Sequence, residues 1–149
     1  MERVFEQSLS AKGGYALNLF TLGVPSTIVV DDMIPFYNGK PMAAGPSADK
    51  SLWPMILEKA VAKMRGNYMH IAGGQGYDGI RLIRGGPYES KQVEYMTVEE
   101  IWSTVTHHLD KGDTITAGSN SGSDTDTDAW GVVLGHAYTV AAHKTLKNG

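Results

Sequence analysis

One histidine stands out because of the residues around it. His136 lies in the segment LGHAYTV, within an apolar and β-prone run near the end of the 149-residue chain. Histidine is the most frequent general base in enzymes. A general base needs a nucleophile and an orienting group, and the sequence shows neither beside this residue. On composition alone, a hydrogen-bonded core histidine is therefore the simpler interpretation.

The available residue types limit the chemistry further. The chain contains no cysteine, which excludes disulfide bonds, thiolate metal ligands and a thiol nucleophile of its own. His107 and His108 fall where a helix is predicted to end, and His70 and His143 have no recognisable partner. Because neither an H-x-x-x-H nor an H-E-x-x-H pair occurs, we expect these histidines to be structural or surface residues, and no metal site.

A glycine motif of the dinucleotide-binding type occurs in the middle of the chain. Residues 74–79 read GQGYDG and match G-x-G-x-x-G. The motif holds a pyrophosphate only where a strand precedes it and a long helix follows. Here a predicted helix and the segment NYMHIA precede it, and Gly85 and Gly86 interrupt any long helix after it. We therefore expect no nucleotide site.

An acidic loop carries the start of a calcium-binding pattern. Asp124, Asp126 and Asp128 have the spacing of the first three ligands of a calcium loop. Ala129 takes the place of the glycine at the sharp turn, and Gly135 takes the place of the bidentate glutamate. A solvated acidic loop is the expected structure.

The first half of the chain predicts a hairpin followed by a helix. Residues 15–22 and 27–31 are predicted to form two strands, joined by a turn over residues 23–26, and a second turn is predicted at residues 38–39. From Leu52 to Met64 the apolar residues recur every three to four positions. Ser51 is the expected N-cap of this helix, and Gly66 the expected stop.

The second half predicts a second helix and two strands. Residues 72–86 are rich in glycine and form a junction. Thr97 and Glu100 have the spacing of a capping box, and Gly112 closes the helix that follows. Residues 113–119 predict a strand, and residues 130–146 predict a long strand because of their β-branched content.

Charge and hydropathy exclude several classes of partner. The formal net charge is −3, so no basic surface indicates nucleic acid or an anionic membrane. No run approaches the ~18 apolar residues of a membrane segment, and residues 1–14 lack the apolar stretch of a signal peptide. We expect an intracellular, cytoplasmic protein.

Several segments together resemble the calpain family of papain-like cysteine peptidases. VVDDMIP resembles the family's V-D-D-x-x-P, and LWPMILEKAVAKMRGNY resembles its W-x-x-L-L-E-K-A-Y-A-K-x-x-G-x-Y helix. IAGG and IRGG resemble its two glycine pairs, and GHAYTV resembles the G-H-A-Y-S-V that carries the catalytic histidine. The segments follow the family's order over nearly the whole chain.

The resemblance implies an α+β fold, a fragment of the papain-like core with an antiparallel β-sheet and a few helices. Residues 1–74 would form the rear part of the first lobe, without its cysteine segment. Residues 75–149 would form the front part of the second, histidine-bearing lobe, and the chain would end before the family's asparagine motif. Calcium is implied for the full-length protein only, and no cofactor is assigned to this chain.

The resemblance also assigns site residues. His136 would be the general base of an intracellular cysteine endopeptidase, and Gly74 and Gly135 would contact the substrate backbone. The partners implied are a polypeptide substrate and the remaining parts of the peptidase core. Because the chain lacks the nucleophilic cysteine, we expect it to be inactive alone. The alternative is a non-catalytic calpain-like module for binding or scaffolding.

Overall fold

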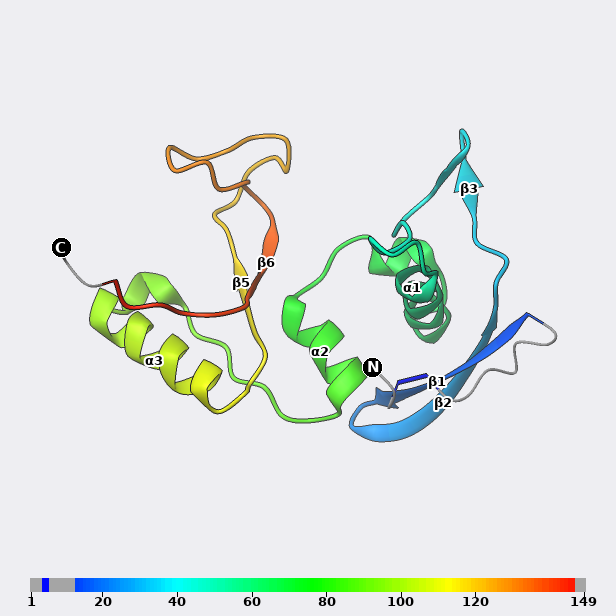
Figure 1. Ribbon diagram of the computed structural model, residues 1–149, viewed down its shortest axis with the longest axis horizontal. Helices are drawn as coiled ribbons and strands as arrows, with labels where there is room; N and C mark the ends of the chain where they lie inside the picture. The colour runs from blue at the N-terminus through cyan, green and yellow to red at the C-terminus, as the bar shows by residue number, and fades with distance from the viewer. Residues whose placement is uncertain (1–3, 6–12, 147–149) are drawn as a thin grey trace. The chain divides into compact units, whose positions relative to one another are not determined.

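The computed structural model describes residues 4–5 and 13–146 of the chain. These residues form two compact units (Figure 1). The first unit contains the residues up to Gly74 together with Asp78–Pro87, and the second contains Gln75–Tyr77 with the residues from Tyr88 onward. The units therefore change at Gly74, where the lobes were predicted to meet, but a ten-residue segment returns to the first unit. Their assignment to peptidase lobes stays a prediction.

The first unit is built on an antiparallel hairpin of β1 (Gly14–Thr21) and β2 (Val24–Asp31). The predicted hairpin is confirmed, but its turn is shorter than expected, because Leu22 and Gly23 alone connect the strands. Both have positive φ, 51° and 83°, as a type I′ turn requires. Pro25 is therefore a strand residue. It stands opposite Phe20, in the second pair from the turn. Alternate pairs of an antiparallel hairpin exchange no ladder hydrogen bonds, so the missing N–H of Pro25 is tolerated there.

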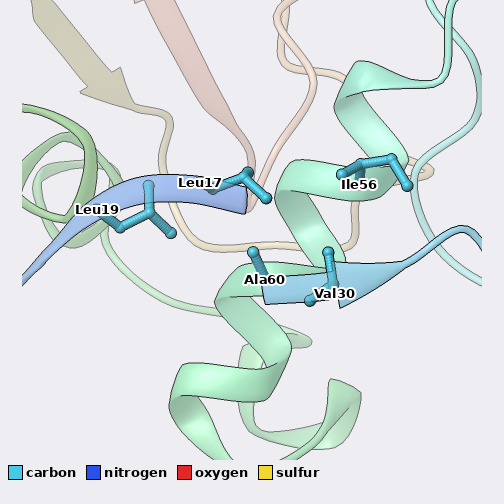
Figure 2. Packing of buried hydrophobic residues seen from close by; sticks show 5 residues of the cluster. All are labelled: Leu17, Leu19, Val30, Ile56 and Ala60. Carbon is cyan, nitrogen blue, oxygen red and sulfur yellow. The ribbon is translucent and has the colours of Figure 1, made fainter. Parts of the chain in front are cut away.

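One face of the hairpin packs against α1 (Trp53–Arg65) and forms the core of the first unit. Figure 2 shows the buried side chains that meet there, which come from β1, β2 and α1: Leu17, Leu19, Val30, Ile56 and Ala60. The strand residues alternate and the helix residues lie four positions apart, so each element presents one apolar face. Burial of these faces is the main force that holds the helix on the hairpin.

The start of α1 differs from the prediction. Leu52 is the N-cap residue, and no side chain caps the helix. Ser51 is engaged elsewhere, because its Oγ lies 2.6 Å from the Oγ of Ser47. Its own N–H donates to Asp49, at 3.0 Å. The expected stop is confirmed, since Gly66 ends the helix with φ of 103°.

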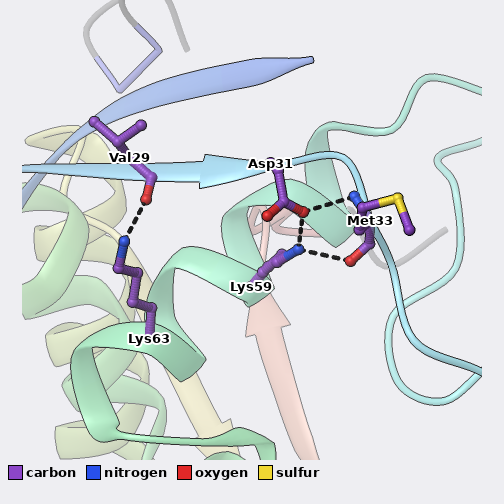
Figure 3. Close-up of polar contacts among 5 residues, drawn as sticks. All are labelled: Val29, Asp31, Met33, Lys59 and Lys63. Atoms are coloured by element: carbon purple, nitrogen blue, oxygen red, sulfur yellow. Dashed lines mark hydrogen bonds and ion pairs between the residues drawn. The ribbon is translucent and has the colours of Figure 1, made fainter. Parts of the chain in front are cut away.

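Two lysines of α1 tie the helix to the outer edge of β2 (Figure 3). Lys59 Nζ contacts the Asp31 carboxylate and donates to the Met33 carbonyl oxygen at 2.6 Å. Lys63 Nζ donates to the carbonyl oxygen of Val29 at 2.7 Å. The hydrogen bond from Lys59 lowers the pKa of Asp31. Such lysines also occupy backbone acceptors that would otherwise be open to another strand.

A short hairpin, a 3₁₀ helix and most of a short α-helix complete the first unit. β3 (Phe36–Tyr37) and β4 (Lys40–Pro41) form a short hairpin whose turn is Asn38-Gly39, as predicted. After α1, the 3₁₀ helix η2 (Tyr68–Ile71) leads into the glycine-rich tract. This tract contains a short helix, α2 (Gly76–Arg84), whose first two residues belong to the second unit.

The second unit contains a capped helix and a small antiparallel sheet. After the 3₁₀ helix η3 (Val93–Tyr95) comes α3 (Val98–Asp110), and its predicted capping box is present. The Glu100 N–H donates to Thr97 Oγ1 at 3.2 Å, and the Thr97 N–H donates to Glu100 Oε2 at 2.8 Å. β5 (Ile115–Gly118) pairs with β6 (Ala137–Val140).

The long strand predicted over residues 130–146 is wrong, because only the four residues of β6 form a strand there. Gly131 and Gly135 have positive φ, 80° and 57°, and such residues interrupt an extended chain. The preceding residues fold back as a narrow hairpin, closed by a bridge between Thr127 and Val133. Trp130 lies at its tip and is 89% exposed.

The described chain is thus α+β, with three α-helices and three two-stranded antiparallel sheets among residues 4–5 and 13–146. The predicted class of a few helices with antiparallel sheet is confirmed at this level. Among the same residues, none of the helices has the length and apolar character needed to cross a bilayer.

Candidate active site

His136 directly precedes β6 and is exposed. This exposure excludes the core-histidine interpretation, which required an imidazole enclosed by apolar side chains. The buried residues among those described are all apolar and belong to β1, β2 and α1. The imidazole is therefore open to a reaction partner.

The backbone of His136 is held on both sides by Ser119, which follows β5. The His136 N–H donates to Ser119 Oγ at 2.9 Å. The His136 carbonyl oxygen accepts from the Ser119 N–H at 2.9 Å and from its hydroxyl at 3.1 Å. Ser119 and His136 continue the β5–β6 register by one pair, but a hydroxyl replaces the backbone carbonyl as acceptor. These three bonds fix the backbone from which the imidazole projects.

The ring of His136 lies against Tyr138, two residues along the chain. Their ring centroids are 5.2 Å apart and their planes meet at 72°, an edge-to-face arrangement. Tyr138 is itself anchored, because its Oη accepts the N–H of Val133 at 3.0 Å. Among the described residues, no side chain forms a hydrogen bond with the imidazole nitrogens. The imidazole of His136 is therefore contacted by an aromatic ring, and its nitrogens have no side-chain hydrogen-bond partner among these residues.

Gly135 precedes His136 at a position that only glycine fits. Its φ is 57°, and a Cβ added there would lie 2.4 Å from the backbone oxygen of Gly122. Its N–H donates to the carbonyl oxygen of Asn120 at 2.7 Å. The resemblance implied that Gly135 contacts the substrate backbone, whereas the backbone that lies against it here is that of Gly122 in the same chain. Contact between Gly135 and a substrate stays a prediction.

Gly74 belongs to the first unit, whereas Gly135 and His136 belong to the second. Gly74 has φ of 154°, and a Cβ added to it would meet no atom within 4 Å. Its main chain is therefore open on that side. Gly135, His136, Ser119 and Tyr138 lie together in the second unit, whereas Gly74 belongs to the first unit. The predicted substrate contact of Gly74 remains untested.

Two histidines expected to lack partners have them. His70 Nδ1 lies 2.7 Å from the carbonyl oxygen of Arg65, at the end of α1. His143 Nε2 lies 2.9 Å from Asp110 Oδ1, and its ring meets Trp102 edge-to-face. The sequence could not reveal the second pair, because it joins residues 33 positions apart.

His107 and His108 lie in the last turn of α3, as predicted. His108 Nδ1 is 2.8 Å from Asp113 Oδ2, and this hydrogen bond lowers the pKa of Asp113. These contacts close the helix end. They place no nucleophile beside either ring.

The acidic loop does not arrange its carboxylates as a calcium loop does. Asp128 Oδ1 accepts the N–H groups of Trp130 and Val132, at 2.8 and 2.9 Å. This carboxylate therefore closes the tip of the hairpin. Among residues 4–5 and 13–146, no three His, Cys, Asp or Glu side chains gather as metal ligands.

The GQGYDG tract lacks the setting of a dinucleotide site. The 3₁₀ helix η2 precedes it in place of a strand, and α2 after it has nine residues. The strand that would deliver a pyrophosphate to the helix is absent from this part of the described chain.

Ser119 and Tyr138 are the site residues that sequence reasoning missed. Tyr138 could have been found from its position, since residues i and i+2 share one face of a strand. Ser119 could not, because its role depends on the register between two strands 18 residues apart.

The fold and the site define an α+β chain with an exposed, backbone-anchored histidine and no thiol of its own. The sequence profile described as calpain family cysteine protease matches residues 1–149. The chain belongs to this family of cysteine proteases.

Individual relatives agree with this assignment. The chain is 34% identical over 146 residues to the calpain-type cysteine protease ADL1 of Oryza sativa subsp. japonica and to DEK1 of Zea mays. It is 28% identical over 153 residues to the calpain-1 catalytic subunit of Homo sapiens. The alignments cover 93% and 98% of this chain, but only 7% of the two plant proteins and 21% of the human subunit.

Proposed function

We propose that the chain forms part of the papain-like catalytic core of a calpain-like cysteine endopeptidase and supplies its general base, His136. The observation that carries the proposal is the exposed imidazole of the GHAYTV segment, in a chain that matches the calpain family throughout. Ser119 supports the role by fixing the histidine backbone, and Tyr138 supports it by contacting the ring. A base that is held in one geometry is what efficient proton transfer requires.

The proposed chemistry is acyl transfer through a thiol. An imidazole nitrogen of His136 takes the proton from a cysteine thiol, and the thiolate forms a bond to the peptide carbonyl carbon. The imidazolium returns the proton to the amine nitrogen as the C–N bond breaks, which leaves a thioester. Water, deprotonated by the same imidazole, then hydrolyses the thioester and restores the thiol.

The cysteine must come from a different stretch of polypeptide, because this chain has none. The partners proposed are therefore a polypeptide substrate and the remaining parts of the peptidase core. Gly74 and Gly135 would hydrogen-bond to the extended substrate through their main chains, as strand-like peptides are commonly bound. An intracellular, cytoplasmic location is proposed with this function.

Calcium is proposed for the whole protein only. Among the described residues no three His, Cys, Asp or Glu side chains gather as ligands for an ion, and Asp128 Oδ1 already accepts two backbone N–H groups. No step of the proposed mechanism uses the ion.

Complementation tests the proposal. The purified chain is assayed on a fluorogenic peptide alone and then with a polypeptide that carries the cysteine-bearing segment of the same protein. We expect no cleavage by the chain alone and thiol-dependent cleavage by the mixture, abolished by an alkylating reagent.

The assigned base is tested in the same mixture. His136→Ala should reduce cleavage by about 10²- to 10⁴-fold, the usual contribution of a general base. His107→Ala is the matched control, because His107 is also exposed and also contacts a second aromatic ring, and it should cleave at the wild-type rate. Full activity of His136→Ala would refute the assignment.

The absence of cysteine also supports a second candidate, a calpain-like module for binding or scaffolding. The two candidates differ in the rest of the protein. A Q-x-x-x-x-x-C-W segment before these residues and an N-P-W segment after them would support the peptidase. Substituted residues at the glutamine, cysteine and asparagine positions would support the scaffold.

A further inference from the structure

Tyr138 connects two parts of the second unit. Its ring contacts the His136 imidazole edge-to-face, with centroids 5.2 Å apart. Its hydroxyl accepts the Val133 N–H at 3.0 Å. Val133 pairs with Thr127 in the narrow hairpin of residues 126–134, where the Leu134 N–H also donates to the Asp126 carbonyl oxygen. One side chain therefore extends from this hairpin to the candidate base.

The side chain of Tyr138 is restrained at both ends. The strand backbone holds the Cα end, because Tyr138 is paired with Ala117 of β5. The hydrogen bond from Val133 holds the hydroxyl end. A ring fixed in this way presents a constant surface to its neighbour, and an exposed imidazole without such a surface samples several staggered rotamers.

We propose that Tyr138 is a positioning residue that holds the His136 ring in one orientation and makes this orientation depend on the hairpin of residues 126–134. The inference deepens the proposed function and rests on His136 being the base. When the hairpin opens, Val133 withdraws its N–H, the Tyr138 ring loses one restraint, and the imidazole gains rotational freedom. The hairpin thereby regulates how often the base points at its thiol.

The test uses the 149-residue chain and two substitutions of Tyr138. Tyr138→Leu removes the ring, and Tyr138→Phe keeps the ring but removes the hydroxyl. NMR three-bond couplings and nuclear Overhauser effects measure the rotamer populations of His136, and amide exchange measures the opening of Val133. Tyr95→Leu is the control, since Tyr95 also lies in the second unit and is 82% exposed.

In Tyr138→Leu, the ratio of the main His136 rotamer to the others should fall about fivefold, the equivalent of a typical aromatic pair. In Tyr138→Phe, Val133 exchange should rise about fivefold, the equivalent of one hydrogen bond, and the His136 ratio should lie between wild type and Tyr138→Leu. Tyr95→Leu should leave both quantities unchanged. A merely structural tyrosine would alter stability without changing the rotamers of the folded protein.

A His136 rotamer ratio equal to wild type in either variant would overturn the proposal. If Tyr138→Leu loses the dispersed amide signals of β5, the unit has unfolded and Tyr138→Phe decides. The readout needs no thiol, so it can fail or succeed independently of the complementation assay. Absence of cleavage by the wild-type mixture would refute the proposed function and leave the measured ring orientation intact.

Discussion

Gly135→Ala adds one methyl group directly before His136, at a position where two separate physical effects oppose it. The residue has φ of 57°, a left-handed conformation that side chains with a Cβ disfavour. The added Cβ would also lie 2.4 Å from the backbone oxygen of Gly122. Because that oxygen belongs to the main chain, no side-chain rotation can relieve the overlap. Either the Gly122 backbone or the backbone at Gly135 and His136 must move.

The two effects can be separated with a second glycine. Alanine in the left-handed region costs about 1–2 kcal/mol, and overpacking that displaces backbone costs about 1–3 kcal/mol more. Gly135→Ala should therefore lower the free energy of unfolding of the second unit by about 3 kcal/mol. Gly131→Ala is the matched control, because Gly131 has φ of 80° but no atom within 4 Å of an added Cβ. It should show the conformational effect alone.

Urea unfolding, followed by the amide signals of the second unit, measures the free energy of unfolding of both variants. In Gly135→Ala the Ser119 N–H, which donates to the His136 carbonyl oxygen, should also exchange faster than in Gly131→Ala. If the two variants differ by less than about 0.5 kcal/mol, the ordinary effect of a surface substitution, then Gly122 does not restrict Gly135 and the described site geometry is wrong.

Three further changes test local features. Leu22→Asn should stabilise the first unit by up to about 1 kcal/mol in urea unfolding, because asparagine tolerates the left-handed turn conformation better than leucine; a loss of stability would contradict the turn assignment. Thr97→Ala should destabilise α3 by about 1 kcal/mol through loss of the cap to Glu100, and an unchanged midpoint would show that the capping box contributes nothing. The pKa of Asp49 is lowered from 3.8 to about 2, mainly by the Ser47 hydroxyl, so the contribution of this carboxylate to stability is complete above pH 4 and is lost as the pH falls toward 2. In Asp49→Asn the free energy of unfolding should therefore change less between pH 4 and pH 2 than in wild type, and above pH 5 the two proteins should show the same dependence on pH.

Local signals in the sequence predicted the elements that depend on neighbouring residues. The capping box at Thr97, the glycine stop at Gly66 and the Asn38-Gly39 turn all appear as expected. Each acts within one helical turn or one hairpin, so the residues that determine it are adjacent in the sequence.

The errors arose where several local patterns compete. Serine is a favoured N-cap residue, but the hydroxyl of Ser51 forms a hydrogen bond with the hydroxyl of Ser47, and the helix begins without a side-chain cap. Residues 130–146 have strand composition, but the left-handed conformations of Gly131 and Gly135 interrupt the extended chain before β6. A propensity states what a residue favours on average, and tertiary contacts select among the alternatives.

The sequence by itself determined that the chain carries no thiol and that its segments follow the order of the calpain family, with His136 in the histidine motif. Only the tertiary structure decided that this imidazole is exposed, that Ser119 holds its backbone and that Tyr138 contacts its ring. The physical reason is the range of the interactions. A motif is defined by residues that are adjacent in the sequence. The partners of His136 depend instead on the register in which β5 pairs with β6, and this register joins residues that are far apart in the sequence.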